Sequence, residues 1–180
     1  MSRLSAGRRA AAAVGVLASL AGAASFVRGW RRRKGNRTDV KNIARRLAED
    51  PWRGKLDEVL DLIGEGFVGH VPGSPEPLRG KQGFREFATT YLSAFPDGTL
   101  TVDDQIAEGN MFATRWTGRG THTGELMGVP ATGRQVTISG ITYGRIVDGK
   151  AWEAWSIWDT LSLLQQLGVI PEMIAAPRSP

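Results

Sequence analysis

Cysteine is absent from the 180-residue sequence, which excludes disulfides and thiolate metal sites. Histidine is scarce as well. With only His70 and His122, a metal centre built on several imidazoles is not expected. The sequence also shows no tandem repeat and no glycine-rich phosphate loop. The lack of cysteine leaves the cellular compartment open.

Acidic residues are absent from residues 1–37, which carry nine lysines and arginines. The remaining 143 residues carry the other 14 basic residues and all 18 acidic ones, a formal charge of −4. The net charge of +5 therefore belongs to the N-terminal segment. Because the rest of the chain is mildly acidic, we expect no nucleic-acid partner.

An uncharged stretch, residues 10–27, lies inside that basic segment, and eight of its 18 residues are alanine. Its length is near the minimum of about 17–20 residues for a membrane span. More basic residues follow it than precede it, so an anchor here would keep the domain in the cytoplasm. The alternatives are a signal peptide cleaved near Ala21-Gly22-Ala23 and a basic tail on a cytoplasmic protein. The sequence leaves all three open.

Residues 38–170 are predicted to form one domain, followed by a tail of residues 171–180. Apolar side chains recur at helical spacing in three segments before residue 96 and in one at the end of the domain. Thr38 or Asp39 can cap the first helix. The predicted helices are 40–50, 55–66, 84–95 and 161–171.

The apolar pattern changes to period two after the turn at Pro96-Asp97-Gly98. Asp148-Gly149 is a strong hairpin signal, and Gly109-Asn110 marks a second turn. A short strand is also expected at residues 67–70. The four longer predicted strands are 99–109, 110–124, 134–147 and 150–160.

Helices followed by an antiparallel meander predict the α+β class. A sheet of this length must curve to bury its apolar side against three helices. Gly140 and Gly144 lie inside one strand, where glycine often marks a bend. A curved sheet closed by helices leaves a hollow that aromatic side chains can line. The sequence therefore predicts a small-molecule pocket.

Several strings resemble the SnoaL-like polyketide cyclases, also called ester cyclases, of the nuclear transport factor 2-like superfamily. The resemblance covers about residues 40–168. It is carried mainly by residues 118–141 (GRGTHTGELMGVPATGRQVTISGI) and 145–168 (RIVDGKAWEAWSIWDTLSLLQQLG), with support from residues 67–73 and 94–117.

This resemblance implies a cone-shaped α+β barrel with one pocket, closed by N-terminal helices, in a homodimer or higher homo-oligomer. It also implies intramolecular aldol ring closure of a small apolar or aromatic carbonyl compound, without metal or organic cofactor. Such a reaction needs a base to remove a proton next to a carbonyl and a donor to hold the enolate oxygen.

Asp159 is the first candidate for that base, since a buried carboxylate can have a pKa near neutrality. The alternative is that Asp159 caps the helix that follows it. Family members often have aspartate directly after the tryptophan that matches Trp155, and the base can be that residue. Here the position is Ser156, which cannot act as a base unaided. This departure favours binding without catalysis.

His70 and His122 are further catalytic candidates. His70 ends a predicted strand and can serve as an acid or an oxyanion donor, or as an edge histidine bonded to the backbone. His122 belongs to the GTHTGE string, where a structural role competes with catalysis.

Four residues are candidates for substrate binding: Arg115, Tyr143, Glu153 and Trp155. An inward Arg115 would bind a carbonyl or an acidic partner, whereas on the outer face it would form a salt bridge. Tyr143 and Trp155 can stack on a flat ligand, although core packing is the default. Glu153 can orient Arg115 or lie at the surface.

Three functions remain open. The first is a cofactor-independent cyclase or isomerase. The second is a non-catalytic carrier of a small hydrophobic metabolite, tethered to a membrane if residues 10–27 insert. The third is an assembly role, in which the outer face of the sheet recruits a protein partner.

Overall fold

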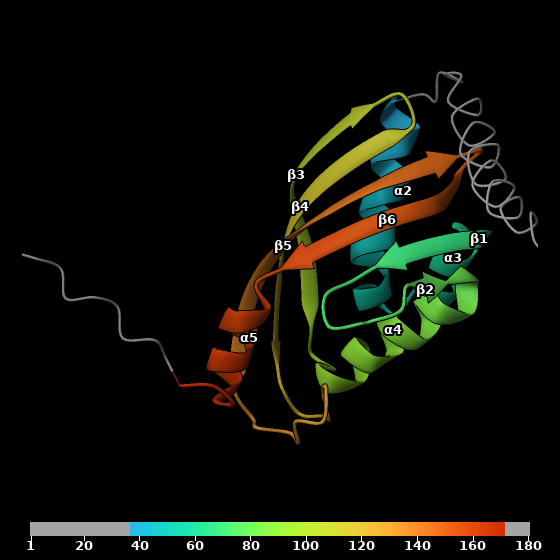
Figure 1. Ribbon diagram of the computed structural model, residues 1–180. Coiled ribbons are helices and arrows are strands. Elements are labelled where there is room, and N and C mark those ends of the chain that lie inside the picture. Colours follow the sequence, from blue (N-terminus) through green and yellow to red (C-terminus); the bar gives the residue numbers. More distant parts are fainter. Residues whose placement is uncertain (1–36, 172–180) are drawn as a thin grey trace, which may run out of the picture. The chain divides into compact units, whose positions relative to one another are not determined.

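The computed structural model describes residues 37–171, which form four α-helices, one short 3-10 helix and a six-stranded sheet (Figure 1). The sequence predictions for residues 10–27 and for the tail after residue 171 lie outside this range. Within residues 37–171, no helix is both long and apolar enough to cross a membrane.

The elements follow one another in the predicted order, with helices before the main sheet strands. The helical elements are α2 (Arg37–Glu49), η1 (Asp50–Arg53), α3 (Leu56–Leu60), α4 (Gly80–Ala94) and α5 (Thr160–Leu167). The strands are β1 (Ile63–His70), β2 (Leu78–Arg79), β3 (Thr99–Glu108), β4 (Met111–Thr121), β5 (Gln135–Val147) and β6 (Lys150–Trp158). The α+β class and the meander from β3 to β6 are confirmed.

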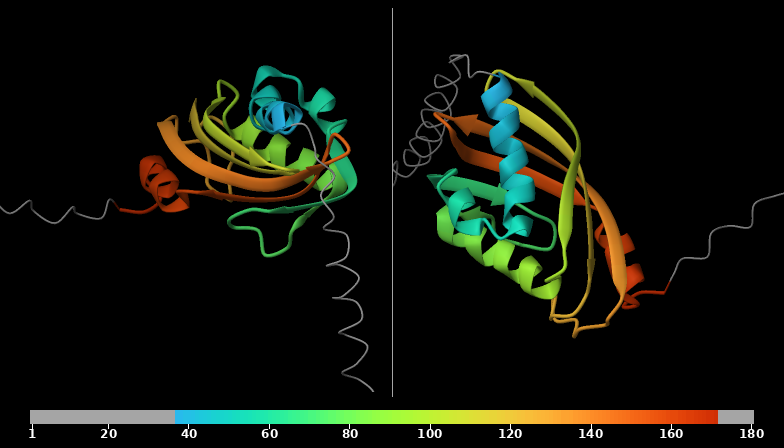
Figure 2. Two further views of the ribbon diagram at one scale, coloured as in Figure 1. Left: turned by 90° about the horizontal axis from the view of Figure 1, so that it is seen from above. Right: turned by 180° about the vertical axis from the view of Figure 1, so that it is seen from behind.

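The strands are ordered β2-β1-β6-β5-β4-β3, and every neighbouring pair is antiparallel except β1 with β6. The sheet is open at both edges and strongly curved. Figure 2 shows α2 and α4 on its concave side. This open, half-wrapped shape corresponds to the expected cone.

The β5–β6 hairpin turns at Asp148 and Gly149, which have φ angles of 49° and 79°. Positive φ at both central residues is what a tight hairpin turn requires, and the Asp-Gly pair supplies it. Gly140 also has a role that the sequence did not predict. A Cβ atom at this position would overlap the ring of Trp116 on the neighbouring strand. Gly140 therefore lets an aromatic side chain lie across the concave face.

The predicted helix 55–66 is wrong in its second half. Helix α3 ends at Leu60, and β1 begins at Ile63. Ile63 pairs with Ala151 of β6 and is only 1% exposed. The apolar spacing of Leu56, Val59, Leu60 and Ile63 suggested one helix, but pairing with a strand nearly 90 residues away determines the conformation of Ile63.

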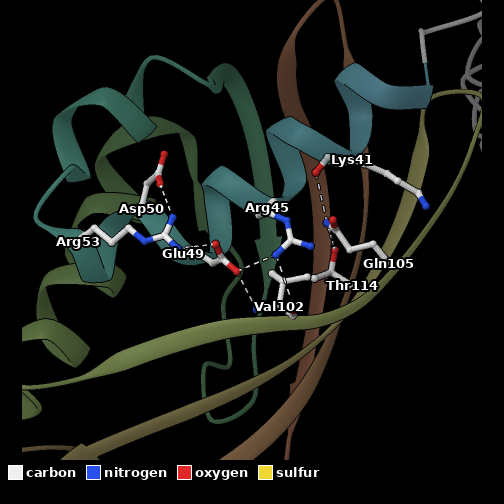
Figure 3. Close-up of polar contacts among 8 residues, drawn as sticks. All are labelled: Lys41, Arg45, Glu49, Asp50, Arg53, Val102, Gln105 and Thr114. Carbon is white, nitrogen blue, oxygen red and sulfur yellow. Dashed lines mark hydrogen bonds and ion pairs between the residues drawn. The ribbon is translucent and has the colours of Figure 1, made fainter.

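A buried polar network fixes α2 and η1 against β3 (Figure 3). Glu49 is 4% exposed, and its carboxylate accepts hydrogen bonds from the backbone N–H of Val102 at 2.9 Å and from Arg45 at 3.0 Å. Arg53 donates to its other oxygen at 2.9 Å. Both oxygens of the Glu49 carboxylate are therefore hydrogen-bonded. These bonds fix the position of α2, which covers one side of the concave face.

Candidate functional site

A cavity of about 190 Å³ lies between the concave face of the sheet and the helices α2 and α4. Most of its lining is apolar and combines aliphatic side chains with nine Phe, Trp and Tyr rings. The aromatic lining residues are Trp52, Phe67, Phe84, Phe87, Tyr91, Phe95, Phe112, Trp116 and Trp158. The predicted pocket, with aromatic side chains around it, is therefore present among the described residues.

A row of hydroxyl groups crosses the apolar sheet face of this cavity. Thr114, Thr142 and Ser156 lie directly opposite one another on β4, β5 and β6, and all three line the cavity. The Oγ atoms of Thr142 and Ser156 are 3.0 Å apart. Trp116 donates its Nε1–H to Thr142 Oγ1 at 3.1 Å. Alternation along the strands puts these side chains on the same face as the buried core.

Thr114 is the most deeply buried member of the row, at 1% exposed. Its Oγ1 accepts a hydrogen bond from Gln105 Nε2 at 3.1 Å, and the same nitrogen is 3.3 Å from the carbonyl oxygen of Lys41 (Figure 3). This bridge ties the polar row to α2. Thr142 and Ser156 are only half-buried, so a ligand in the cavity can reach them.

Tyr91 extends from α4 into the cavity. Its ring packs edge-on against Trp158, with centroids 5.9 Å apart, and lies 5.0 Å from Phe87. Burial raises the pKa of Tyr91 to about 12, because an ionised phenol would be poorly solvated there. Its hydroxyl has no hydrogen-bond partner among the described residues. Tyr91 is therefore a protonated donor at neutral pH.

No aspartate or glutamate occurs among the described residues that line the cavity. The lining includes Ser156 but not Asp159. Asp159 is exposed, and its Oδ1 accepts the backbone N–H of Ser162 at 2.8 Å as the N-cap of α5. The capping interpretation is confirmed. Its position corrects the expectation that Asp159 faces the cavity.

His70 lines the cavity where β1 ends, but its ring turns toward the outer face of the sheet. The ring stacks on Trp155, with centroids 5.0 Å apart and planes 7° apart. Its Nε2 lies 3.4 Å from Glu153 Oε1. Glu153 thus partners His70 rather than Arg115, and its second oxygen is 3.9 Å from Arg145. Nδ1 of His70 has no partner among the described residues.

His122 is fully buried and does not line the cavity. Its Nδ1 accepts the backbone N–H of Thr132 at 3.2 Å, and its backbone pairs with Gly133 and Arg134. It thereby closes the loop between β4 and β5, with Phe95 packed 5.4 Å from its ring. This geometry supports the structural interpretation of His122 and corrects its placement in the site.

The other candidates lie on the outer face. Arg115 is paired with Asp103 at 3.0 Å, the alternative foreseen for an outward arginine. Tyr143 and Trp155 are neighbours on paired strands, 46% and 38% exposed, and do not reach the cavity. Both are therefore displaced from the expected ligand site.

Strand β6 contains a bulge that the alternating pattern did not reveal. Arg145 pairs with Glu153, and Ile146 pairs with Ala151, so Trp152 is the extra residue. Trp152 packs over Gly64 and Gly66 instead of sharing the face of Ser156. Sequence reasoning also missed Thr142, Tyr91 and Trp116. Strand alternation places Thr142 opposite Ser156, but only the fold shows which face is inside.

Comparison with known proteins gives a consistent picture. The model of the SnoaL-like polyketide cyclase family matches residues 41–167. Aklanonic acid methyl ester cyclase DnrD of Streptomyces peucetius is 32% identical over 130 residues, which are 71% of this chain and 89% of that protein. The corresponding cyclase DauD of Streptomyces sp. strain C5 is also 32% identical, over 71% of this chain and 80% of its own length.

Among solved structures, IdmH of Streptomyces antibioticus, proposed to be a polyketide cyclase, is 34% identical. The match has a TM-score of 0.63 and covers 72% of this chain and 98% of IdmH. AclR of Streptomyces galilaeus, proposed to be a hydroxylase, has a TM-score of 0.67 at 28% identity. That match covers 77% of this chain and 86% of AclR.

Proposed function

The chain belongs to the SnoaL-like polyketide cyclase family, and from this premise we propose that it is a cyclase or isomerase acting on a small, mainly apolar carbonyl compound held in the cavity. The observation that carries the proposal is the cavity itself. Its walls are aromatic and aliphatic, and its polar groups are mainly hydroxyl donors suited to a carbonyl oxygen.

The volume of the cavity bounds the ligand. It is larger than the cavity of roughly 150 Å³ that holds benzene in an engineered protein, and smaller than the roughly 300–1,000 Å³ of sites for drug-sized ligands. A compound of one or two rings fits this range. A longer substrate would keep only its reacting part inside.

Ring closure of the aldol type requires one proton to move away from the compound and back. A base removes the proton next to one carbonyl, the resulting enolate carbon attacks a second carbonyl of the same molecule, and the new alkoxide takes the proton back. No bond to the protein forms, and the mass of the compound does not change. Hydroxyl donors in the cavity stabilise the enolate oxygen.

His70 is the one described lining residue with an imidazole or carboxylate side chain, but its ring turns to the outer face, so the described lining presents no general base to the compound. The carboxylate of Glu153, 3.4 Å from Nε2, helps to hold the ring in this outward position. Asp159, as a helix cap outside the cavity, has no part in this scheme.

The test uses a panel of neutral dicarbonyl esters: two compounds of one and two rings, and aklanonic acid methyl ester, after which the relatives are named. Chromatography with mass detection should reveal a product of unchanged mass from at least one smaller compound. Ala154→Phe, which fills the cavity, should abolish conversion. Ser139→Phe, on the exposed outer face, is the matched control. Absence of both binding and conversion across the panel would contradict the proposal.

A second candidate is a carrier that binds such a compound without changing it. The lack of a carboxylate in the described cavity lining favours this alternative. Native mass spectrometry separates the two candidates. A carrier retains the compound and releases it with its original chromatographic mobility, whereas a cyclase releases an isomer.

A further inference from the structure

We propose that the hydroxyls of Thr142 and Ser156 act as one redundant hydrogen-bond donor for the carbonyl oxygen of the ligand, and that the cavity therefore selects neutral carbonyl compounds over carboxylates of the same shape. This inference rests on the proposed function and assigns its ligand chemistry.

Three hydrogens are available in the chain from Trp116 to Ser156: the indole N–H and one hydroxyl hydrogen each on Thr142 and Ser156. The indole can only donate, and it donates to Thr142. The contact between the two hydroxyls uses one more hydrogen, whichever residue donates it. One hydroxyl hydrogen therefore always remains, and both hydroxyls line the cavity.

The position of Trp116 makes this arrangement specific. Its ring lies over Gly140, where any Cβ atom would overlap it, and packs against Trp158 with centroids 6.4 Å apart. Trp116 itself is 7% exposed. A buried donor with one fixed partner keeps Thr142 Oγ1 occupied on one side. The one hydroxyl hydrogen that remains on Thr142 or Ser156 can then point into the cavity.

Charge determines which ligands the donor can serve. In the described lining, Arg119 is the side chain that could pair with a carboxylate ligand, and it is exposed at the sheet surface. The polar row itself is surrounded by aromatic rings. A carboxylate placed against Thr142 would lose its hydration without gaining a counter-charge. A ketone or ester carbonyl needs only the single hydrogen bond that the row offers.

The hydrogen count makes an unusual prediction about variants. In Ser156→Ala, Thr142 still accepts from Trp116 and its own hydrogen becomes free. In Thr142→Val, the hydrogen of Ser156 becomes free. Each single variant therefore keeps one donor, and only the double variant loses it. A purely structural role for either residue would not produce this pattern.

The experiment uses three probes that share the indane ring system, on the full chain: 1-indanone, indane and indane-2-carboxylate. Infrared spectroscopy of bound 1-indanone should show its carbonyl band at lower wavenumber than in hexane, for wild type and for both single variants. The double variant should return the band to its hexane position. It should also weaken 1-indanone binding about three- to ten-fold and leave indane binding unchanged. Indane-2-carboxylate should not bind.

Two controls protect the interpretation. The double variant leaves the Trp116 N–H without a partner. The measurement is therefore repeated on a triple variant that adds Trp116→Phe, which removes this unpaired N–H. Tyr91→Phe, which removes another hydroxyl of the cavity lining, should keep the lowered band. A band still lowered in the double and triple variants, or lost in Tyr91→Phe alone, would overturn this inference and leave the proposed function standing. Failure of 1-indanone and indane to bind wild type would overturn both.

Discussion

Replacing Glu49 with alanine tests how the wall of the cavity is held. The carboxylate is 4% exposed and accepts the backbone N–H of Val102, which would be left buried and unpaired. That loss costs about 1–3 kcal/mol. The pairs with Arg45 and Arg53, whose side chains are 47% and 59% exposed, add at most about 1 kcal/mol each. We expect Glu49→Ala to lower the free energy of unfolding by about 2–4 kcal/mol.

Urea unfolding followed by tryptophan fluorescence measures this change. Glu49→Gln keeps an acceptor for Val102 and should lose about half as much. The matched control is Glu58→Ala, because this side chain is 58% exposed and 3.8 Å from Arg46. It should change stability by less than about 0.5 kcal/mol. A loss below 1 kcal/mol for Glu49→Ala would refute the view that this network fixes α2 on the sheet.

Four further predictions follow from single contacts. His70→Asn should leave both ligand binding and conversion unchanged, because the ring lies on the outer face, and loss of conversion alone would show that His70 takes part in the reaction. Asp159→Asn should keep both conversion and stability, whereas Asp159→Ala should cost about 1 kcal/mol in urea unfolding through loss of the helix cap. The hydrogen bonds from the Thr121 side chain and backbone to Asp97 lower the pKa of that carboxyl below its usual 3.8. The stability they add is therefore present above that pH and lost as the pH falls, and Asp97→Asn should flatten the acid limb of a stability–pH profile. The outer face exposes Ile157 (70%) beside Ile141 (53%), so we expect self-association there, and Ile157→Asp should lower the mass seen by analytical ultracentrifugation.

The elements that the sequence predicted well are those with local causes. Asp148-Gly149 forms its turn from its own φ preferences. The segment 55–66 failed for the opposite reason. The strand conformation of Ile63 comes from its pairing with Ala151, which no local window contains.

The site was less predictable, since alternation gives two faces without saying which is inside. Alternation puts Ser156 and Trp158 on one face of β6 and Trp155 on the other, and the aromatic Trp155 and Tyr143 face outward. Tyr91 looked like an ordinary helix core position. Its hydroxyl becomes informative only once the cavity is seen to lack a carboxylate among its described lining residues.

The most direct test of the account is a crystal structure of the protein with 1-indanone. The account predicts the rings of the ketone among Phe87, Trp116 and Trp158, with its carbonyl oxygen within hydrogen-bond distance of Thr142 or Ser156. A ketone bound only on the outer face beside Trp155, or a cavity that stays without it at saturating concentration, would contradict the central claim.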